Sequence, residues 1–128
     1  MSINLISAWI GLTLGFLGGG VMGMFFRNER WMGGYGGFKR RLYRLAHISF
    51  FGLGFVNLAF ALTARSLPLT PTLAIASIAF VVGAISMPIC ALILAHQPRA
   101  LPLFAVPVGS LLLGGSLTVA QLLKSLAR

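Results

Sequence analysis

Residues 72–95 read TLAIASIAFVVGAISMPICALILA, a mainly apolar run that contains no charged side chain. A helix needs about 20 mainly apolar residues to cross the hydrocarbon layer of a bilayer. The run therefore predicts a transmembrane helix, and three further stretches of similar character lie at 3–26, 45–64 and 101–123. We expect one domain over residues 1–128 that is built from four transmembrane helices.

The connections between the later spans are short and contain proline, which tends to end or start a helix. Pro68 and Pro71 lie in the second connection, and Pro98 and Pro102 lie in the third. Helices joined by short connections are antiparallel neighbours. The sequence thus predicts an all-α integral membrane protein, folded as an up-down bundle of four transmembrane helices.

The composition indicates a protein surrounded by lipid and limits its chemistry. Of the 128 residues, 58% are hydrophobic and 9% are charged, whereas a soluble domain has about 25% charged residues. Glu29 is the single carboxylate side chain, which excludes a paired-carboxylate site, a Ser-His-Asp triad and an oxygen-rich metal site within the chain. The single cysteine, Cys90, excludes an internal disulfide and a cysteine-rich metal site. We therefore predict a protein that is not an enzyme and has no catalytic or metal-binding residues.

The basic residues are divided unequally between the two sides of the predicted bundle. Seven lie in the connection at 27–44 and in the third connection, and three lie on the opposite side. Because Lys and Arg near span ends are enriched in the cytoplasm, we expect the 27–44 connection in the cytoplasm, both termini outside, and a bacterial inner membrane as the location. The seven are Arg27, Arg30, Lys39, Arg40, Arg41, Arg44 and Arg99, and the three are Arg65, Lys124 and Arg128.

The 27–44 connection also contains aromatic residues, such as Trp31 and Tyr35, of the kind that settles among lipid headgroups. Its four glycines predict a flexible loop, and from Lys39 onward the pattern suits a helix that continues into the second span. Its six basic residues are predicted to bind anionic lipid on the cytoplasmic side or to dock onto an acidic partner protein. The net charge of +9 can also indicate nucleic-acid binding, but these charges flank membrane spans, so we predict no nucleic-acid partner.

The first span contains glycine at every fourth position, which aligns these residues on one face of a helix. The four are Gly11, Gly15, Gly19 and Gly23. Small residues let membrane helices approach closely and gain van der Waals contact. The glycine face therefore predicts helix packing, either within the bundle or against another subunit. The alternative is a flat ligand, such as a haem, a quinone, a carotenoid or a chlorin.

Two histidines are candidates for a cofactor site. His47 lies one turn into the second span, and Gly54 on the same face leaves space beside the imidazole for a flat ring. His96 ends the third span at the same depth, so the two could ligate a haem b, or one could hydrogen-bond a quinone. The alternative is that both bind ordinary interfacial groups. Asn57, also in the second span, is predicted to hydrogen-bond across helices.

The sequence favours one function class and leaves two others open. A packing face and a basic loop without catalytic residues are typical of a non-catalytic subunit in a larger membrane complex, such as a respiratory or photosynthetic complex of electron transport. The first alternative is a small membrane protein that binds haem, quinone or pigment through His47. The second is an oligomeric channel, whose pore would form between copies because four spans enclose little volume.

Overall fold

The computed structural model describes residues 2–127, and its regular structure is helical. The four long helices are α1 (Ser2–Met24), α2 (Phe38–Thr63), α3 (Pro71–His96) and α4 (Ala105–Leu126). Each is long and apolar enough to cross a membrane. The prediction of an all-helical protein with four membrane-length helices is therefore confirmed. Arg128, which entered the predicted charge balance, lies outside the described residues.

Local sequence determines where the helices begin and end. Short 3₁₀ helices occur in the three connections, at Trp31–Gly33, Ala64–Ser66 and Pro98–Phe104. Thr70 caps α3, because its side-chain oxygen accepts a hydrogen bond from the backbone N–H of Leu73 at 3.3 Å. Pro71 then occupies the first helical position, where a missing N–H leaves no helical hydrogen bond unmade.

α2 begins at Phe38, one residue before Lys39, from which the sequence pattern predicted a helix that continues into the span at 45–64. The connection over 27–44 therefore consists of a loop that ends at Gly37 and the first turns of α2, which carry four of its cations. These are Lys39, Arg40, Arg41 and Arg44. Lys and Arg favour the helical conformation and can extend their charges away from the apolar layer. The helix therefore starts directly after the last glycine of the loop, Gly37.

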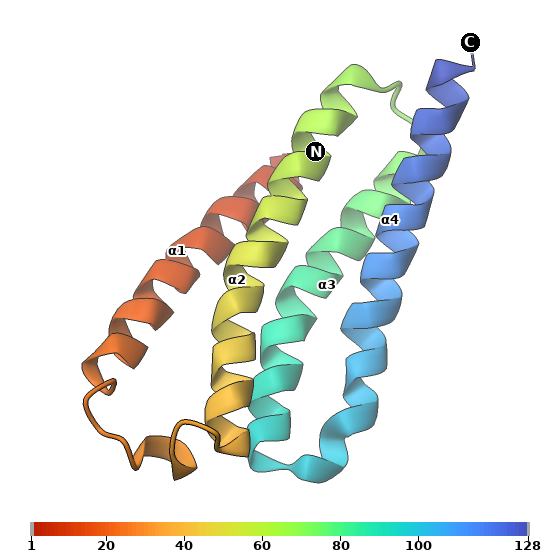
Figure 1. Ribbon diagram of the computed structural model, residues 1–128. Coiled ribbons are helices and arrows are strands. Elements are labelled where there is room, and N and C mark those ends of the chain that lie inside the picture. Colours follow the sequence, from red (N-terminus) through yellow and green to blue (C-terminus); the bar gives the residue numbers. More distant parts are fainter. Residues whose placement is uncertain (1, 128) are drawn as a thin grey trace.

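The helices lie side by side in the order α1, α2, α3, α4, and sequence neighbours run antiparallel (Figure 1). α2 and α3 form the inner pair, while α1 packs mainly on α2 and α4 packs on α3. Across residues 2–127, α1 and α4 share no packed interface, so the bundle is open on that side. α1 begins and α4 ends at the same end of the molecule (Figure 1). The opposite end, formed by residues 25–44 and 97–104, is named the basic end.

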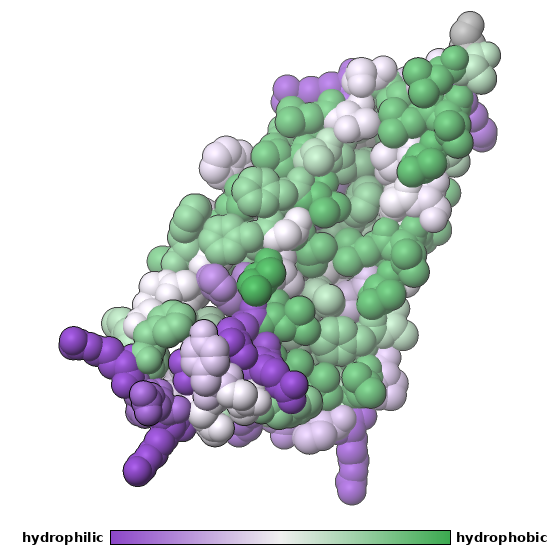
Figure 2. Space-filling view, viewed as in Figure 1, coloured by the Kyte–Doolittle hydropathy of each residue, from purple (hydrophilic) through white to green (hydrophobic). Residues whose placement is uncertain are grey.

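The core is small and lies mainly between α2 and α3. Phe60 and Phe80 pack with their ring centroids 5.0 Å apart, and Leu73 beside them is completely buried. Many large apolar side chains instead face outward, for example Phe16 on α1 and Leu112 on α4. Figure 2 shows the result as a broad hydrophobic band with hydrophilic groups gathered towards the ends. Such a surface suits a protein whose surrounding solvent is lipid.

A polar cluster joins α1, α2 and α3 at the end away from the basic end. The Nδ2 group of Asn4 donates hydrogen bonds to Oδ1 of Asn57 at 2.9 Å and to the backbone oxygen of Ser77 at 3.0 Å. The Ser77 hydroxyl donates to Oδ1 of Asn4, and Nδ2 of Asn57 donates to the backbone oxygen of Phe80 at 3.2 Å. Both asparagines are completely buried. We name Asn4, Asn57 and Ser77 the polar clamp; the predicted cross-helix bonding of Asn57 is confirmed.

Candidate functional site

The glycine face of α1 lies against α2 over its first half. A Cβ atom at Gly11 would lie 3.1 Å from the backbone oxygen of Phe50, and one at Gly15 would lie 2.8 Å from the ring of Phe51. The Phe51 ring also meets Phe16 edge-on, with 5.1 Å between ring centroids. The missing side chains at these two glycines let α2 approach α1. This part of the groove is therefore filled by residues of the same chain.

His47 occupies the next part of the groove. Its Nε2–H donates a hydrogen bond to the backbone oxygen of Gly15 at 3.0 Å. A Cβ atom at Gly19 would lie 2.8 Å from that nitrogen, so the glycine is what lets the imidazole reach the α1 backbone. At Gly23, the last residue of the repeat, such an atom would meet nothing within 4 Å. The structure thus makes His47 a link between α1 and α2.

Gly54 lies where the two backbones cross closely. A Cβ atom there would lie 3.2 Å from the backbone oxygen of Ala8 and 3.3 Å from the side chain of Leu12. The sequence suggested that Gly54 leaves space for a flat ring on the face of His47. In the structure α1 fills the space on the Cβ side of Gly54, and the same glycine also lines the apolar pocket between α1 and α3.

His96, the last residue of α3, is held by α2. A hydrogen bond of 2.9 Å joins its Nε2 to the hydroxyl of Tyr43, and the two rings meet edge-on with centroids 6.0 Å apart. The Nε2 atoms of His96 and His47 are therefore engaged with different partners on different helices. Within residues 2–127, no group of three or more His, Cys, Asp or Glu side chains is placed to hold a metal ion.

The basic end contains a compact group of cations and aromatic rings. The guanidinium carbon of Arg40 lies 4.8 Å from the ring centroid of Tyr35 and 5.6 Å from that of Trp31. The guanidinium of Arg44 lies 5.0 Å from the same tyrosine ring, and its Nη2 donates to the Tyr35 backbone oxygen at 3.2 Å. Trp31 in turn stacks on Phe25. Cation–π attraction therefore helps to hold the loop on the first turns of α2.

The loop backbone has a defined turn geometry. Gly33 and Gly34 adopt φ angles of 84° and 86°, in the left-handed region that favours glycine, and Met32 adopts 55°. A Cβ atom at Gly37 would lie only 2.6 Å from the backbone oxygen of Met32. In the structure the glycines that predicted flexibility therefore form a turn that is tightly packed at Gly37.

Arg40 differs from the other basic residues assigned to lipid or partner docking. It is only 3% exposed, and its Nη1 atom is buried without a hydrogen-bond partner. Arg44 is half-buried. The remaining four are exposed: Arg27, Arg30, Lys39 and Arg41. Figure 2 shows hydrophilic side chains that project from this end of the molecule, as a surface for lipid headgroups or an acidic protein requires.

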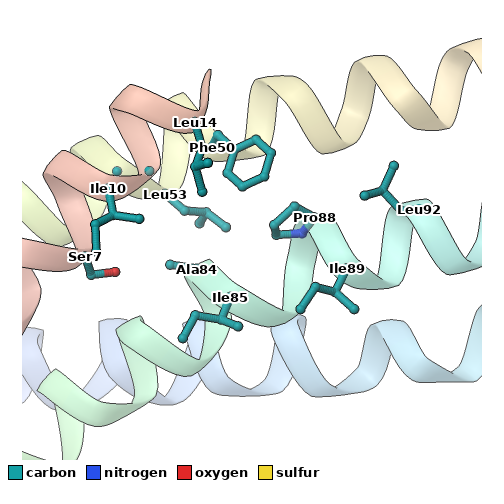
Figure 3. Close-up of a pocket in the computed structure, with 12 residues that line it drawn as sticks. Ser7, Ile10, Leu14, Phe50, Leu53, Ala84, Ile85, Pro88, Ile89 and Leu92 are labelled. Carbon is teal, nitrogen blue, oxygen red and sulfur yellow. The ribbon is translucent and has the colours of Figure 1, made fainter. Parts of the chain in front are cut away.

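Residues of α1, α2 and α3 line an apolar pocket of about 270 Å³. Figure 3 shows its lining, to which Leu14 of α1, Phe50 of α2 and Pro88 of α3 contribute. Ser7 supplies the single polar side chain among the residues that line it. The sequence did not predict this pocket, which lies beyond the polar clamp where α1 and α3 separate. Its lining suits a lipid acyl chain or an apolar ring better than a polar substrate.

Replacing Gly19 with alanine is expected to lower the free energy of unfolding by about 1–3 kcal/mol, because the new methyl group displaces Nε2 of His47 and breaks its bond to Gly15. Unfolding by SDS titration in detergent micelles measures the change. Gly23→Ala is the matched control, since its methyl group meets open space on the same helix and alanine favours the helix. Equal stability of the two variants would contradict the linking role of His47.

Sequence reasoning missed the role of Asn4 and the burial of Arg40. Asn4 carried a signal, because a lone amide in an apolar helix must find a partner inside the protein. The burial of Arg40 carried no such signal, since a positive residue at a span end is ordinarily solvated. In comparisons with known proteins, no family model, curated protein or solved structure matches the chain.

Proposed function

We propose that this protein is a non-catalytic subunit of a larger complex in a bacterial cytoplasmic membrane, attached to a partner protein through α4. The observation that carries the proposal is a shallow groove of about 510 Å³ along the outer side of α4. The groove is lined by Leu111, Leu112, Gly115, Ser116, Val119, Ala120 and Leu123.

The groove has the residue spacing of a helix-packing face. Leu112, Ser116, Val119 and Leu123 follow one another at intervals of four, three and four residues, which places them on one side of a helix. A Cβ atom at Gly115 would meet nothing within 4 Å, so the chain itself makes no use of this glycine. A helix from another chain would use it, because small residues allow close backbone approach in a membrane.

The position of α4 in the fold supports the same proposal. α4 is an outer helix, and within residues 2–127 its main packing partner is α3. Large side chains such as Leu112 and Leu123 are 66% and 63% exposed. Lipid can cover such side chains, but the small residues between them form the recess into which a partner helix fits.

The basic end completes the proposal. Because connections rich in Lys and Arg prefer the cytoplasm, the residues at 27–44 and Arg99 face the cytoplasm. The N-terminus and the C-terminus then lie on the opposite side of the membrane. There the exposed cations contact anionic lipid or acidic groups of the partner. The identity of the partner will decide whether the complex is respiratory or photosynthetic.

Native mass spectrometry of the protein, extracted from its own membranes in mild detergent, tests this proposal. We expect a hetero-complex of fixed stoichiometry that Gly115→Leu disrupts, because leucine fills the groove without touching the rest of the chain. Gly52→Leu is the control on α2, where an added side chain also meets open space, and we expect it to leave the complex intact.

Two other results would contradict the subunit proposal. A homo-oligomer that retains a haem, quinone or pigment mass, lost in His47→Ala, would favour a cofactor-binding protein. A homo-oligomer that carries lipid alone and conducts ions in liposomes would favour a channel.

A further inference from the structure

Arg40 is a buried cation without a hydrogen-bonding counterpart. Its side chain is 3% exposed, and its Nη1 atom has no partner. Removing a charge from water is unfavourable unless other groups compensate it. The rings of Tyr35 and Trp31 supply part of that compensation, but a ring face does not accept the directed hydrogen bonds of a guanidinium group. The arrangement therefore leaves a guanidinium donor without an acceptor.

A pocket adjoins this cation. It measures about 340 Å³ and is lined by Phe26, Glu29, Tyr35 and Arg40. Glu29 is the one carboxylate side chain in the sequence, so the pocket combines a cation, an anion and two aromatic walls. It lies at the basic end beside the end of α1, and Phe26 is 61% exposed there. This is the level at which aromatic residues meet lipid headgroups.

We propose that this pocket binds the phosphoethanolamine headgroup of a membrane lipid. The phosphate accepts hydrogen bonds from the guanidinium group of Arg40, which lines the pocket, since Arg recognises phosphate with several donors at once. The ammonium group of the headgroup donates to the carboxylate of Glu29. The acyl chains extend from the pocket past Phe26 into the hydrocarbon layer.

The charges of Arg40 and Glu29 in the pocket favour the zwitterionic phosphoethanolamine headgroup over a headgroup that is only anionic. Glu29 repels a ligand that carries negative charge without a balancing cation, whereas the neighbouring guanidinium of Arg44, held over Tyr35, favours the phosphate. A zwitterionic headgroup satisfies both signs within one pocket. The inference requires that the helices lie in a membrane but not that the protein belongs to a complex, so it can fail or succeed independently of the proposed subunit role.

The test reconstitutes the purified full chain into nanodiscs that contain phosphatidylethanolamine and phosphatidylglycerol in equal amounts. Native mass spectrometry then measures which lipid remains bound after the disc is removed. We expect phosphatidylethanolamine to be retained in preference to phosphatidylglycerol. Arg40→Gln should reduce this retention about tenfold or more, the effect of losing a hydrogen bond to a charged group. Arg41→Gln, which removes the same charge from the exposed neighbouring position, should change it less than about twofold.

Glu29→Gln tests recognition of the ammonium group separately from recognition of the phosphate. Because Glu29 is exposed on the loop, its replacement should leave the fold intact, and we expect it to abolish the preference for phosphatidylethanolamine while phospholipid retention continues. An unchanged preference in Glu29→Gln would overturn the assignment of the amine. Equal losses in Arg40→Gln and Arg41→Gln would overturn the pocket and indicate general attraction to charge.

A lysine variant and competition by inorganic phosphate test the same pocket. If Arg40→Gln fails to fold, Arg40→Lys keeps the charge but loses the planar donor set, and we expect it to retain less lipid than Arg41→Lys. Inorganic phosphate added to the wild-type protein should not displace the lipid at equal concentration, because it lacks the acyl chains and the amine. Displacement by inorganic phosphate would overturn the lipid assignment in favour of a free anion.

Discussion

Gly54→Leu should separate α1 from α2 and lower the free energy of unfolding by about 3 kcal/mol, the upper part of the range for overpacking. A side chain at this position points at the backbone oxygen of Ala8, 3.2 Å from the position of Cβ. The backbone of Ala8 cannot change its rotamer as a side chain can, so α1 and α2 must move apart. SDS titration measures the loss of stability, and faster proteolysis in the loop at residues 25–37 reports the separation.

Gly52→Leu is the matched control for that measurement. Gly52 lies on the same helix and receives the same added volume, but its Cβ position has nothing within 4 Å. We expect Gly52→Leu to be as stable as the wild type or slightly more stable, because leucine is the better helix former. If both variants lost stability equally, the crossing of α1 and α2 at Gly54 would not be a close contact.

Asn57→Leu is expected to lower the free energy of unfolding by about 2 kcal/mol. The substitution removes the hydrogen bond that Asn57 accepts from Asn4 and the one that it donates to the backbone oxygen of Phe80, and it leaves buried polar groups without a partner. Interhelical hydrogen bonds in membrane proteins are individually worth about 0.6 kcal/mol, up to about 1.7. The two lost interhelical bonds and the unpaired groups together account for the expected change.

A double-mutant cycle provides the control for the polar clamp. Asn4→Leu alone should destabilise the protein, but the double variant Asn4→Leu/Asn57→Leu should be destabilised by clearly less than the sum of the two single changes. Replacing both members of a buried pair removes the unsatisfied groups that each single variant leaves behind. Additive effects would show that the two amides do not depend on each other, contrary to the 2.9 Å contact between them.

The sequence predicted the helices well because the signal for a membrane span is carried by every residue within it. It also identified Asn57, since an amide in an apolar helix needs a partner. The partner itself was not predictable, because Asn4 and Ser77 are distant in the chain and meet only through the way three helices pack. The helical pattern from Lys39 onward also agrees with the start of α2 at Phe38, because Lys and Arg favour a helix as well as a membrane surface.

The candidate site was less predictable than the fold for the same reason. His47 and the glycine face were both recognised, but their mutual contact depends on helix rotation, which hydrophobicity constrains little when most faces of a helix are apolar. The burial of Arg40 depends on two rings from a loop whose turn is set by left-handed backbone angles. Composition places such cations at a membrane surface and carries no information on which one is covered.

The polar clamp attaches α1 to α2 and α3 near Asn4, so α1 can pivot about this residue. Beyond that point the apolar pocket lies between α1 and α3, and α1 packs mainly on α2. Any tilt of α1 about Asn4 moves its C-terminal end, next to the loop, further than its N-terminal end, and so changes the width of the pocket most on the side of the loop. Occupancy of the pocket and the position of the loop at residues 25–37 are therefore mechanically connected, and an acyl chain that widened the one would displace the other.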